Sequence, residues 1–89
     1  MKTHELKIWP EYFNAIVEGR KTFEIRWNDR AFQEGDSLNL REWEPLRKRY
    51  SGRRLDAETT YVIVGPAWDL PEGIAVMSIK ILRSWAGAE

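Results

Sequence analysis

The last third of the chain holds two stretches, "TTYVIVG" and "GIAVMSIKIL", that are rich in β-branched residues. Runs of this kind are typical of β-strands. The segment between them, "PAWDLPEG", contains two prolines and a glycine, which is typical of a loop and not of a helix. Strands that are joined by turns instead of crossover helices favour an antiparallel sheet. The chain is therefore expected to be mainly β.

One helix is predicted at about residues 10–18. Pro10 suits the first helical position, because the amide of that residue has no partner within a helix. Phe13, Ile16 and Val17 follow the i, i+3, i+4 spacing of one apolar face, and Gly19 is well placed to end the helix.

After this helix the hydrophobic period changes to two. Phe23 and Ile25 alternate with polar residues, so a strand that begins near residue 21 would place Thr22, Glu24 and Arg26 together on its other face. Trp27 continues the Phe23 and Ile25 side and is expected to pack in the core.

Alternation resumes in "SLNLREW", where Leu38 and Leu40 are predicted to point inward. Residues 44–56 read as irregular and basic, with "RRL" as one further short strand. The sum is an α+β, mainly β domain over residues 1–89, with four to six strands curled into a small antiparallel barrel and the helix packed beside it.

Composition excludes several classes of function. The 14 basic and 14 acidic side chains cancel, so only a local patch could attract nucleic acid. There is no cysteine, and His4 is the one histidine, which leaves no material for a thiol, zinc or Ser/His/Asp site. No apolar run has the length of a signal peptide core or a membrane span, so a cytoplasmic protein without a membrane partner is expected.

The segment "GRKTFEIR" concentrates candidate chemistry in Lys21, Glu24 and Arg26. A carboxylate between two cations is a poor general acid, but it can accept hydrogen bonds, while the arginine can hold a phosphate or a carbonyl group. The alternative is an exposed charge network of small energetic value. Composition alone favours that second interpretation.

A second cluster, "LRKRYSGRRL" (residues 46–55), surrounds Tyr50 with five cations, among them Arg53. Basic side chains with an aromatic residue are typical of a surface that follows phosphates and stacks bases, and equally of a solvated loop. Arg30 and Arg41 would extend the positive surface.

The tryptophans divide by position. Trp9 precedes the helix and could brace its start or flank a pocket. Trp43 is a candidate for the core together with Trp27. Trp68 lies in the proline-rich loop and is expected to be partly exposed, where an aromatic ring can stack on a base.

No metal site and no cofactor are predicted. The spacing of Asp29, Asp36 and Asp69 relative to Glu24 fits no pattern of metal ligands, and Asp36 is better explained by its turn. His4 is expected to be structural or solvent-exposed.

The spacing of Gly19, Lys21, Glu24 and Arg26 resembles the G-x-K-x-x-E-x-R motif of the ASCH domain (activating signal cointegrator homology), a branch of the PUA-like superfamily. The surrounding sequence, with "YSGR" and "LPEG" further on, is more similar still to a small bacterial and phage subgroup catalogued as a domain of unknown function. The resemblance covers nearly the whole chain, and its first half is the specific part.

The resemblance implies a PUA-like β-barrel in which a helix lies beside a cleft lined by Lys21, Glu24 and Arg26. Because the superfamily commonly binds RNA or modified nucleobases, it also implies RNA or a modified nucleotide as the partner. Under this hypothesis the two cations contact phosphate or carbonyl groups and Glu24 accepts hydrogen bonds from a base. Trp9 or Trp68 would stack, and Arg30, Arg41 and Arg53 would widen the positive surface.

Two alternatives stay open. One small ASCH-like group removes the acetyl group from acetylcytidine with a lysine at the position of Lys21, a threonine three residues later and a distant glutamate. Here Lys21 matches the lysine, Glu24 stands where that group has the threonine, and Glu72 is a loose candidate for the distant glutamate. Such an enzyme, or a ribonuclease, would use Lys21 and Glu24 as catalytic residues. The other alternative is non-catalytic protein binding through exposed aromatic residues near Trp43 and Trp68.

Overall fold

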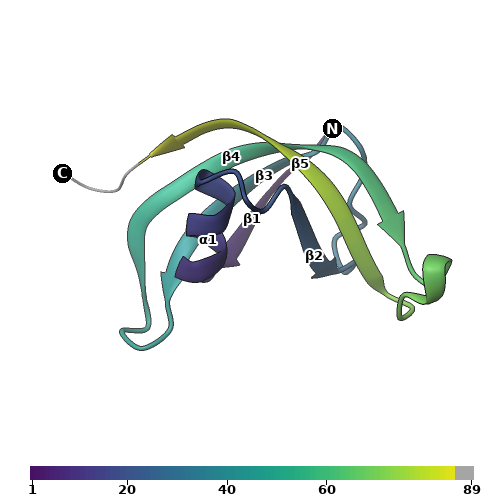
Figure 1. The fold of residues 1–89 in the computed structure, drawn as a ribbon, viewed down its shortest axis with the longest axis horizontal. Helices are drawn as coiled ribbons and strands as arrows, with labels where there is room; N and C mark the ends of the chain where they lie inside the picture. The colour runs from purple at the N-terminus through teal and green to yellow at the C-terminus, as the bar shows by residue number, and fades with distance from the viewer. Residues whose placement is uncertain (86–89) are drawn as a thin grey trace.

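The computed structural model describes residues 1–85, which form a curved β-sheet around one α-helix (Figure 1). The elements of this part of the chain are β1 (Thr3–Ile8), α1 (Pro10–Val17), β2 (Phe23–Trp27), β3 (Ser37–Glu44), β4 (Arg49–Val64), the short 3₁₀ helix η1 (Ala67–Asp69) and β5 (Ile74–Trp85). The mainly β prediction is confirmed. No helix in residues 1–85 is long and apolar enough to cross a membrane.

The sheet has the strand order β1-β3-β4-β5-β2 and curls into a half-barrel that arches over α1 (Figure 1). The pairs β3–β4, β4–β5 and β5–β2 are antiparallel, as predicted. The pair β1–β3 is parallel, so the expectation of a wholly antiparallel sheet is wrong. Between β1 and β3 the chain forms α1 and the opposite edge strand β2. This long connection allows β3 to run in the same direction as β1.

Strand β1 has an ordinary alternating pattern, although no strand was expected there. His4, Leu6 and Ile8 point inward and are buried. His4 is accommodated because its Nε2 atom lies 2.9 Å from Oδ2 of Asp36, which also accepts a hydrogen bond from the Gln33 amide. The structural interpretations of His4 and of Asp36 in its turn are both confirmed.

Helix α1 starts at Pro10 and ends one residue before the predicted boundary, which is within the usual uncertainty of helix ends. Gly19 adopts φ 81°, a left-handed conformation that favours glycine and lets the chain reverse. Phe13 and Ile16 are buried against the concave side of the sheet. Val17, expected on the same face, is 48% exposed.

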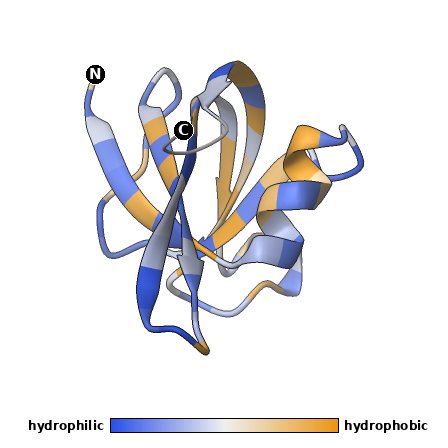
Figure 2. Ribbon diagram, turned by 90° about the vertical axis from the view of Figure 1, so that its left-hand side faces the viewer, coloured by the Kyte–Doolittle hydropathy of each residue, from blue (hydrophilic) through white to orange (hydrophobic). Residues whose placement is uncertain are grey.

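The core lies between α1 and the inner face of the half-barrel, and hydrophobic and hydrophilic positions alternate along the strands around it (Figure 2). Leu38 and Leu40 are fully buried there, as predicted. Leu55 and Ala57 of β4 and Ala75 and Met77 of β5 also belong to the inner face.

The basic segment after β3 is not irregular. A tight turn leads directly into β4, a strand of 16 residues. The pairing shifts between Arg41 and Trp43, and Gly52 in the opposing stretch of β4 has φ 97°, so a bulge lets the strand bend without ending. Trp43, predicted as a candidate for the core, is only half-buried and lies on the side of the sheet away from the core, beneath the Lys7 ammonium, so that prediction is wrong.

Strand β2 faces the opposite way from the prediction. Glu24 is 3% exposed, whereas Phe23, Ile25 and Trp27 are 42%, 55% and 66% exposed. Glu24 and Arg26 lie opposite Met77 and Ala75, which belong to the core face. Because faces alternate strictly along a strand, burying Glu24 turns all three apolar residues outward.

Candidate ligand-binding pocket

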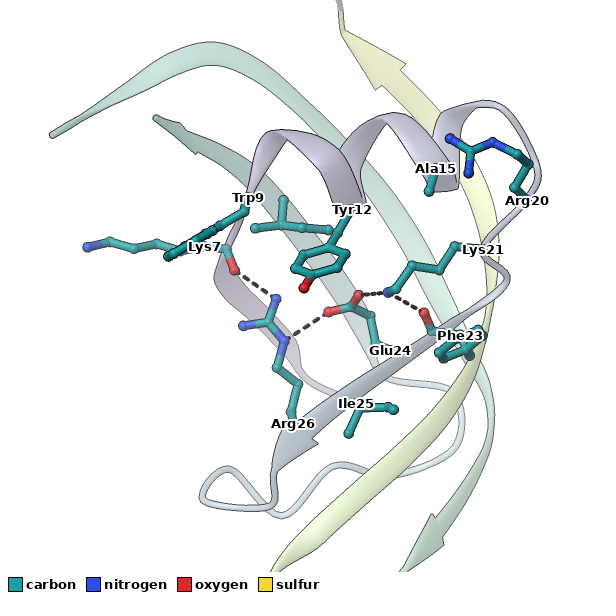
Figure 3. Close-up of a pocket in the computed structure, with 11 residues that line it drawn as sticks. Lys7, Trp9, Tyr12, Ala15, Arg20, Lys21, Phe23, Glu24, Ile25 and Arg26 are labelled. Carbon is teal, nitrogen blue, oxygen red and sulfur yellow. Dashed lines mark hydrogen bonds and ion pairs between the residues drawn. The ribbon is translucent and has the colours of Figure 1, made fainter. Parts of the chain in front are cut away.

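A pocket of about 730 Å³ opens between α1, the end of β1 and the edge strand β2 (Figure 3). Eleven residues line it: Lys7, Ile8, Trp9, Tyr12, Ala15, Arg20, Lys21, Phe23, Glu24, Ile25 and Arg26. The pocket lies where the two edge strands of the half-barrel, β1 and β2, approach each other. The predicted residues Trp9, Lys21, Glu24 and Arg26 are therefore brought together in one place.

The turn after α1 positions Lys21. The amides of Arg20 and Lys21 both donate to the carbonyl oxygen of Ala15, at 2.9 and 3.0 Å, so the chain folds back under the helix. Strand β2 begins directly afterwards, and its alternation places Glu24 and Arg26 on the side that faces α1. Local chain geometry thus converts the sequence spacing of the motif into a cluster.

Glu24 is the centre of a buried ion-pair network. Its Oε1 accepts a hydrogen bond from Lys21 Nζ, and its Oε2 accepts one from Arg26 Nε at 2.8 Å. The side chains of Glu24, Lys21 and Arg26 are 4%, 16% and 24% exposed. The expectation of an exposed strand face is therefore wrong, because the carboxylate lies at the bottom of the pocket with both oxygens occupied.

Arg26 also crosses from one edge of the sheet to the other. Its Nη2 donates to the carbonyl oxygen of Lys7 in β1 at 2.7 Å. Figure 3 shows this carbonyl pointing at the guanidinium while the Lys7 side chain leads away from the pocket. The first and last strands in the sheet order are thus joined through a side chain.

Both cations keep donors for a further acceptor. The Lys21 ammonium has three N–H groups, and the described contacts are with Glu24 and, at 2.6 Å, with the Phe23 carbonyl. Arg26 has five N–H groups, of which two are used within residues 1–85. Since two cations surround one carboxylate, the floor carries a net positive charge.

Exposed aromatic rings stand around this charged floor. Trp9, Tyr12 and Phe23 are 51%, 49% and 42% exposed. The Lys21 ammonium lies 5.0 Å from the centre of the Phe23 ring and 5.8 Å from that of Tyr12. The pocket therefore combines flat apolar surfaces with cationic hydrogen-bond donors, which suits a planar ligand that carries oxygen acceptors.

The remaining predicted site residues lie elsewhere. Arg30 is exposed in the loop after β2, and Trp68, 86% exposed, lies in η1. Arg41 covers the ring of Tyr50, with its guanidinium carbon 4.1 Å from the ring centre. Glu72 is exposed in the loop before β5. None of these side chains lines the pocket, and Trp68 is more exposed than the partial exposure predicted for it.

Arg53 has a structural position between the helix and the sheet. Its guanidinium donates to both oxygens of Glu42 and, at 2.9 Å, to Oδ1 of Asn14 in α1. Hydrogen bonding from Arg53 lowers the pKa of the Glu42 carboxyl although burial opposes this, and Ser51 Oγ adds a further hydrogen bond. The same pair raises the pKa of Arg53. The Arg53 guanidinium is therefore bound to Glu42 and Asn14, and Arg53 does not line the pocket.

Sequence reasoning missed several pocket residues. Tyr12 was detectable, since it is an aromatic residue on the predicted helix outside the Phe13 and Ile16 face. Lys7 gave no signal, because its contact with Arg26 is made by the backbone. Among residues 1–85, no group of three or more histidine, cysteine, aspartate or glutamate side chains is arranged to hold a metal ion.

Residues 3–79 match the family described as "Domain of unknown function (DUF3850)". The chain is also similar to the "Uncharacterized 12.9 kDa protein in GpA 3'region" of Escherichia phage P2, with 39% identity over 61 residues. That match covers 68% of this chain and 54% of the phage protein, so the chain spans about half the length of this relative. The predicted similarity to a subgroup of unknown function with phage members is confirmed.

Proposed function

The chain belongs to the DUF3850 family, and we propose that this member is an RNA-binding or nucleotide-binding domain that holds a nucleotide in the pocket beside α1. We also propose that its half-barrel is a variant of the PUA-like fold and its G-x-K-x-x-E-x-R segment an ASCH motif. One observation carries the proposal: the Lys21–Glu24–Arg26 network forms the floor of a pocket that has exposed aromatic rings around it.

Each part of the pocket suits one part of a nucleotide. Lys21 and Arg26 would donate to phosphate or carbonyl oxygens, because both have N–H groups beyond those used in their described contacts. Trp9 or Tyr12 would stack on the base, because both rings are exposed and every base has a flat face that can stack on an aromatic ring. The positive floor would favour the phosphate over a neutral ligand.

Glu24 has a different role from the one expected from sequence. Its carboxylate is 4% exposed and accepts hydrogen bonds from both neighbouring cations. A group with so little exposed surface is better suited to orienting Lys21 and Arg26 than to reading a base edge. Glu24 is therefore proposed as a positioning residue.

The same contacts favour binding over hydrolysis. Lys21 donates two hydrogen bonds, to Glu24 and to the Phe23 carbonyl, so its nitrogen already serves as a donor to groups of the protein. A lysine base or nucleophile instead has to direct the lone pair of its amine at the substrate. A ribonuclease mechanism that uses histidine as acid or base is also disfavoured. His4 is the one histidine of the sequence, and it is buried against Asp36 and does not line the pocket.

The proposal is tested by fluorescence anisotropy with a labelled single-stranded RNA. We expect binding that weakens with salt and is lost in Lys21→Ala/Arg26→Ala. Tyr12→Ala should weaken binding by roughly 5- to 150-fold if this ring stacks on a base. Because Arg26 also joins two strands, Tyr12→Ala/Lys21→Ala serves as a second pocket variant, and Lys80→Gln, exposed on β5, is the matched control.

Unchanged affinity in both pocket double variants, with the folded state confirmed by circular dichroism, would sink the proposal. Equal weakening by Lys80→Gln would likewise contradict it, since binding would then depend on total charge alone.

A further inference from the structure

The face of the sheet opposite the core, here called the outer face, carries a row of basic residues on adjacent strands. Lys7 of β1 is paired in register with Arg41 of β3, and Arg41 is paired with Arg54 of β4. Arg54 is in turn paired with Trp85 of β5. Three like charges thus lie side by side across three strands, an arrangement that is ordinarily unfavourable.

Each cation of this row lies over an aromatic ring. The Lys7 ammonium is 3.9 Å from the ring centre of Trp43, and the guanidinium carbons of Arg41 and Arg54 are 4.1 and 4.4 Å from those of Tyr50 and Trp85. These contacts fix the three heads on the surface without neutralising them, because a ring carries no net charge.

Carboxylates do not compensate the row. Within residues 1–85, none of the ion pairs involves Lys7, Arg41 or Arg54, so no carboxylate oxygen lies within 4 Å of their charged nitrogens. The nearby acids Asp56 and Glu44 are engaged by Arg83 at 3.6 Å and Arg49 at 3.3 Å. Glu5, two residues before Lys7 on the same face of β1, is paired with Asn39 and so lies in the neighbouring row. A neutral protein thus concentrates uncompensated positive charge in one place.

The row begins at the pocket. Lys7 lines the pocket and its carbonyl oxygen accepts the hydrogen bond from Arg26, whereas its side chain leads away from the pocket (Figure 3). The Lys7 ammonium lies over the ring of Trp43. A ligand that leaves the pocket past Lys7 therefore meets Arg41 and then Arg54. With about 4.8 Å between strands, the row from Lys7 to Arg54 is about 10 Å long, the length of a few nucleotides.

We propose that the outer-face row Lys7, Arg41 and Arg54 is a second binding element, which follows the phosphates of a single-stranded RNA whose neighbouring nucleotide occupies the pocket. The identity of this ligand rests on the proposed function of the pocket. Charge complementarity selects a polyanion, and the guanidinium planes and rings select one that also has flat bases, which an acidic peptide lacks. A short oligonucleotide engages both elements, whereas a mononucleotide engages the pocket alone.

The test compares decauridylate with uridine 5′-monophosphate at about 50 mM and about 200 mM salt, with the 89-residue chain. Arg41→Gln/Arg54→Gln should make the negative slope of log affinity against log salt shallower by about 1.4 for decauridylate, since each phosphate contact to a single strand contributes about −0.7. The fourfold rise in salt should then weaken the wild type roughly sevenfold more than the variant. Affinity for the mononucleotide should not change.

Two further variants separate charge from folding. Arg41→Lys/Arg54→Lys keeps the charges and should keep the salt slope, while Lys2→Gln/Lys80→Gln removes two exposed charges outside the row and should also keep it.

Each result bears on a different proposal. An unchanged slope in Arg41→Gln/Arg54→Gln, with decauridylate still bound, overturns the row and leaves the pocket intact. If neither probe binds the wild-type protein, the proposed function itself fails. Competition by poly-glutamate as strong as that by decauridylate would indicate an acidic protein partner and would also overturn the row.

Discussion

Arg26 of β2 donates a hydrogen bond of 2.7 Å to the carbonyl oxygen of Lys7 in β1, and so joins the two edge strands of the half-barrel. The same guanidinium holds the Glu24 carboxylate from its Nε. Arg26 therefore both closes the open side of the sheet and helps to form the floor of the pocket.

Replacing Arg26 should destabilise the fold. Arg26→Ala removes one of the two cations that hold the buried Glu24 carboxylate and breaks the contact between the edge strands. We expect the free energy of unfolding to fall by about 1–3 kcal/mol, measured by urea denaturation. Arg26→Lys should recover only part of this, because an ammonium cannot reproduce the two-sided geometry of the guanidinium.

The matched comparison is Arg30→Ala, since Arg30 is exposed in the loop after β2. Its effect should stay within about 0.5 kcal/mol. Equal stabilities for the Arg26→Ala and Arg30→Ala proteins would show that the edge strands do not depend on this contact.

Acid should weaken the fold through two buried carboxylates. Burial alone would raise the pKa of Asp36, but hydrogen bonds from His4 and from the amides of Lys2 and Gln33 outweigh it and lower that pKa below its ordinary value of 3.8. Arg53 lowers the pKa of Glu42 below its ordinary value of 4.5.

The unfolded chain consequently binds more protons than the folded one in this range, so stability rises with pH there. The free energy of unfolding should be steady above the ordinary pKa values and fall as the pH drops below 4.5 and then 3.8 toward the folded-state values. Urea denaturation of Glu42→Gln between about pH 3 and pH 7 should show a shallower fall than the wild type. A fall as steep as that of the exposed-site control Glu5→Gln would exclude Glu42 as a cause.

Arg53 should act as an anchor for α1. Arg53→Ala leaves the Glu42 carboxylate, which is 3% exposed, with Ser51 as its described partner. A cost of about 2–4 kcal/mol is expected, because a buried charge loses its counter-ion. Asn14→Ala loses one hydrogen bond from the Arg53 guanidinium but leaves the Glu42–Arg53 pair intact, and it should cost about 1.5 kcal/mol.

Thermal unfolding of both proteins checks this ordering. If Asn14→Ala proved the more damaging change, the anchor would lie in the helix itself and not in the Glu42–Arg53 pair.

Incubation with acetylcytidine should release no cytidine above the level of a Lys21→Ala control. The reason is that the Lys21 nitrogen is engaged as a hydrogen-bond donor to two acceptors, Glu24 and the Phe23 carbonyl. Chromatographic detection of cytidine is sufficient. Turnover that depends on Lys21 would replace the binding proposal with a hydrolase.

Elements with local signals could be predicted from sequence. Pro10 and Gly19 mark the ends of α1 through backbone constraints that do not depend on the rest of the fold. Leu38 and Leu40 were placed correctly because β3 is an interior strand and its alternation is regular.

The errors came from partners that are distant in sequence. Strand β1 was missed because the burial of His4 depends on Asp36, which lies 32 residues away. The predicted orientation of β2 was inverted. Alternation separates the two faces of a strand but does not say which face is buried, and here the polar face can be buried because Lys21 and Arg26 pair with Glu24. The motif spacing found these three side chains, whereas the Lys7 carbonyl in the same pocket leaves no trace in the sequence.

The central claim is that the pocket beside α1 binds a nucleotide, and a ¹H–¹⁵N NMR titration with uridine 5′-monophosphate tests it most directly. Saturable shift changes should concentrate on the amides of Tyr12, Lys21, Glu24 and Arg26 and on the indole N–H of Trp9, with Trp68 unaffected. Absence of saturable changes, or changes centred on Trp68 and the η1 loop, would contradict the account.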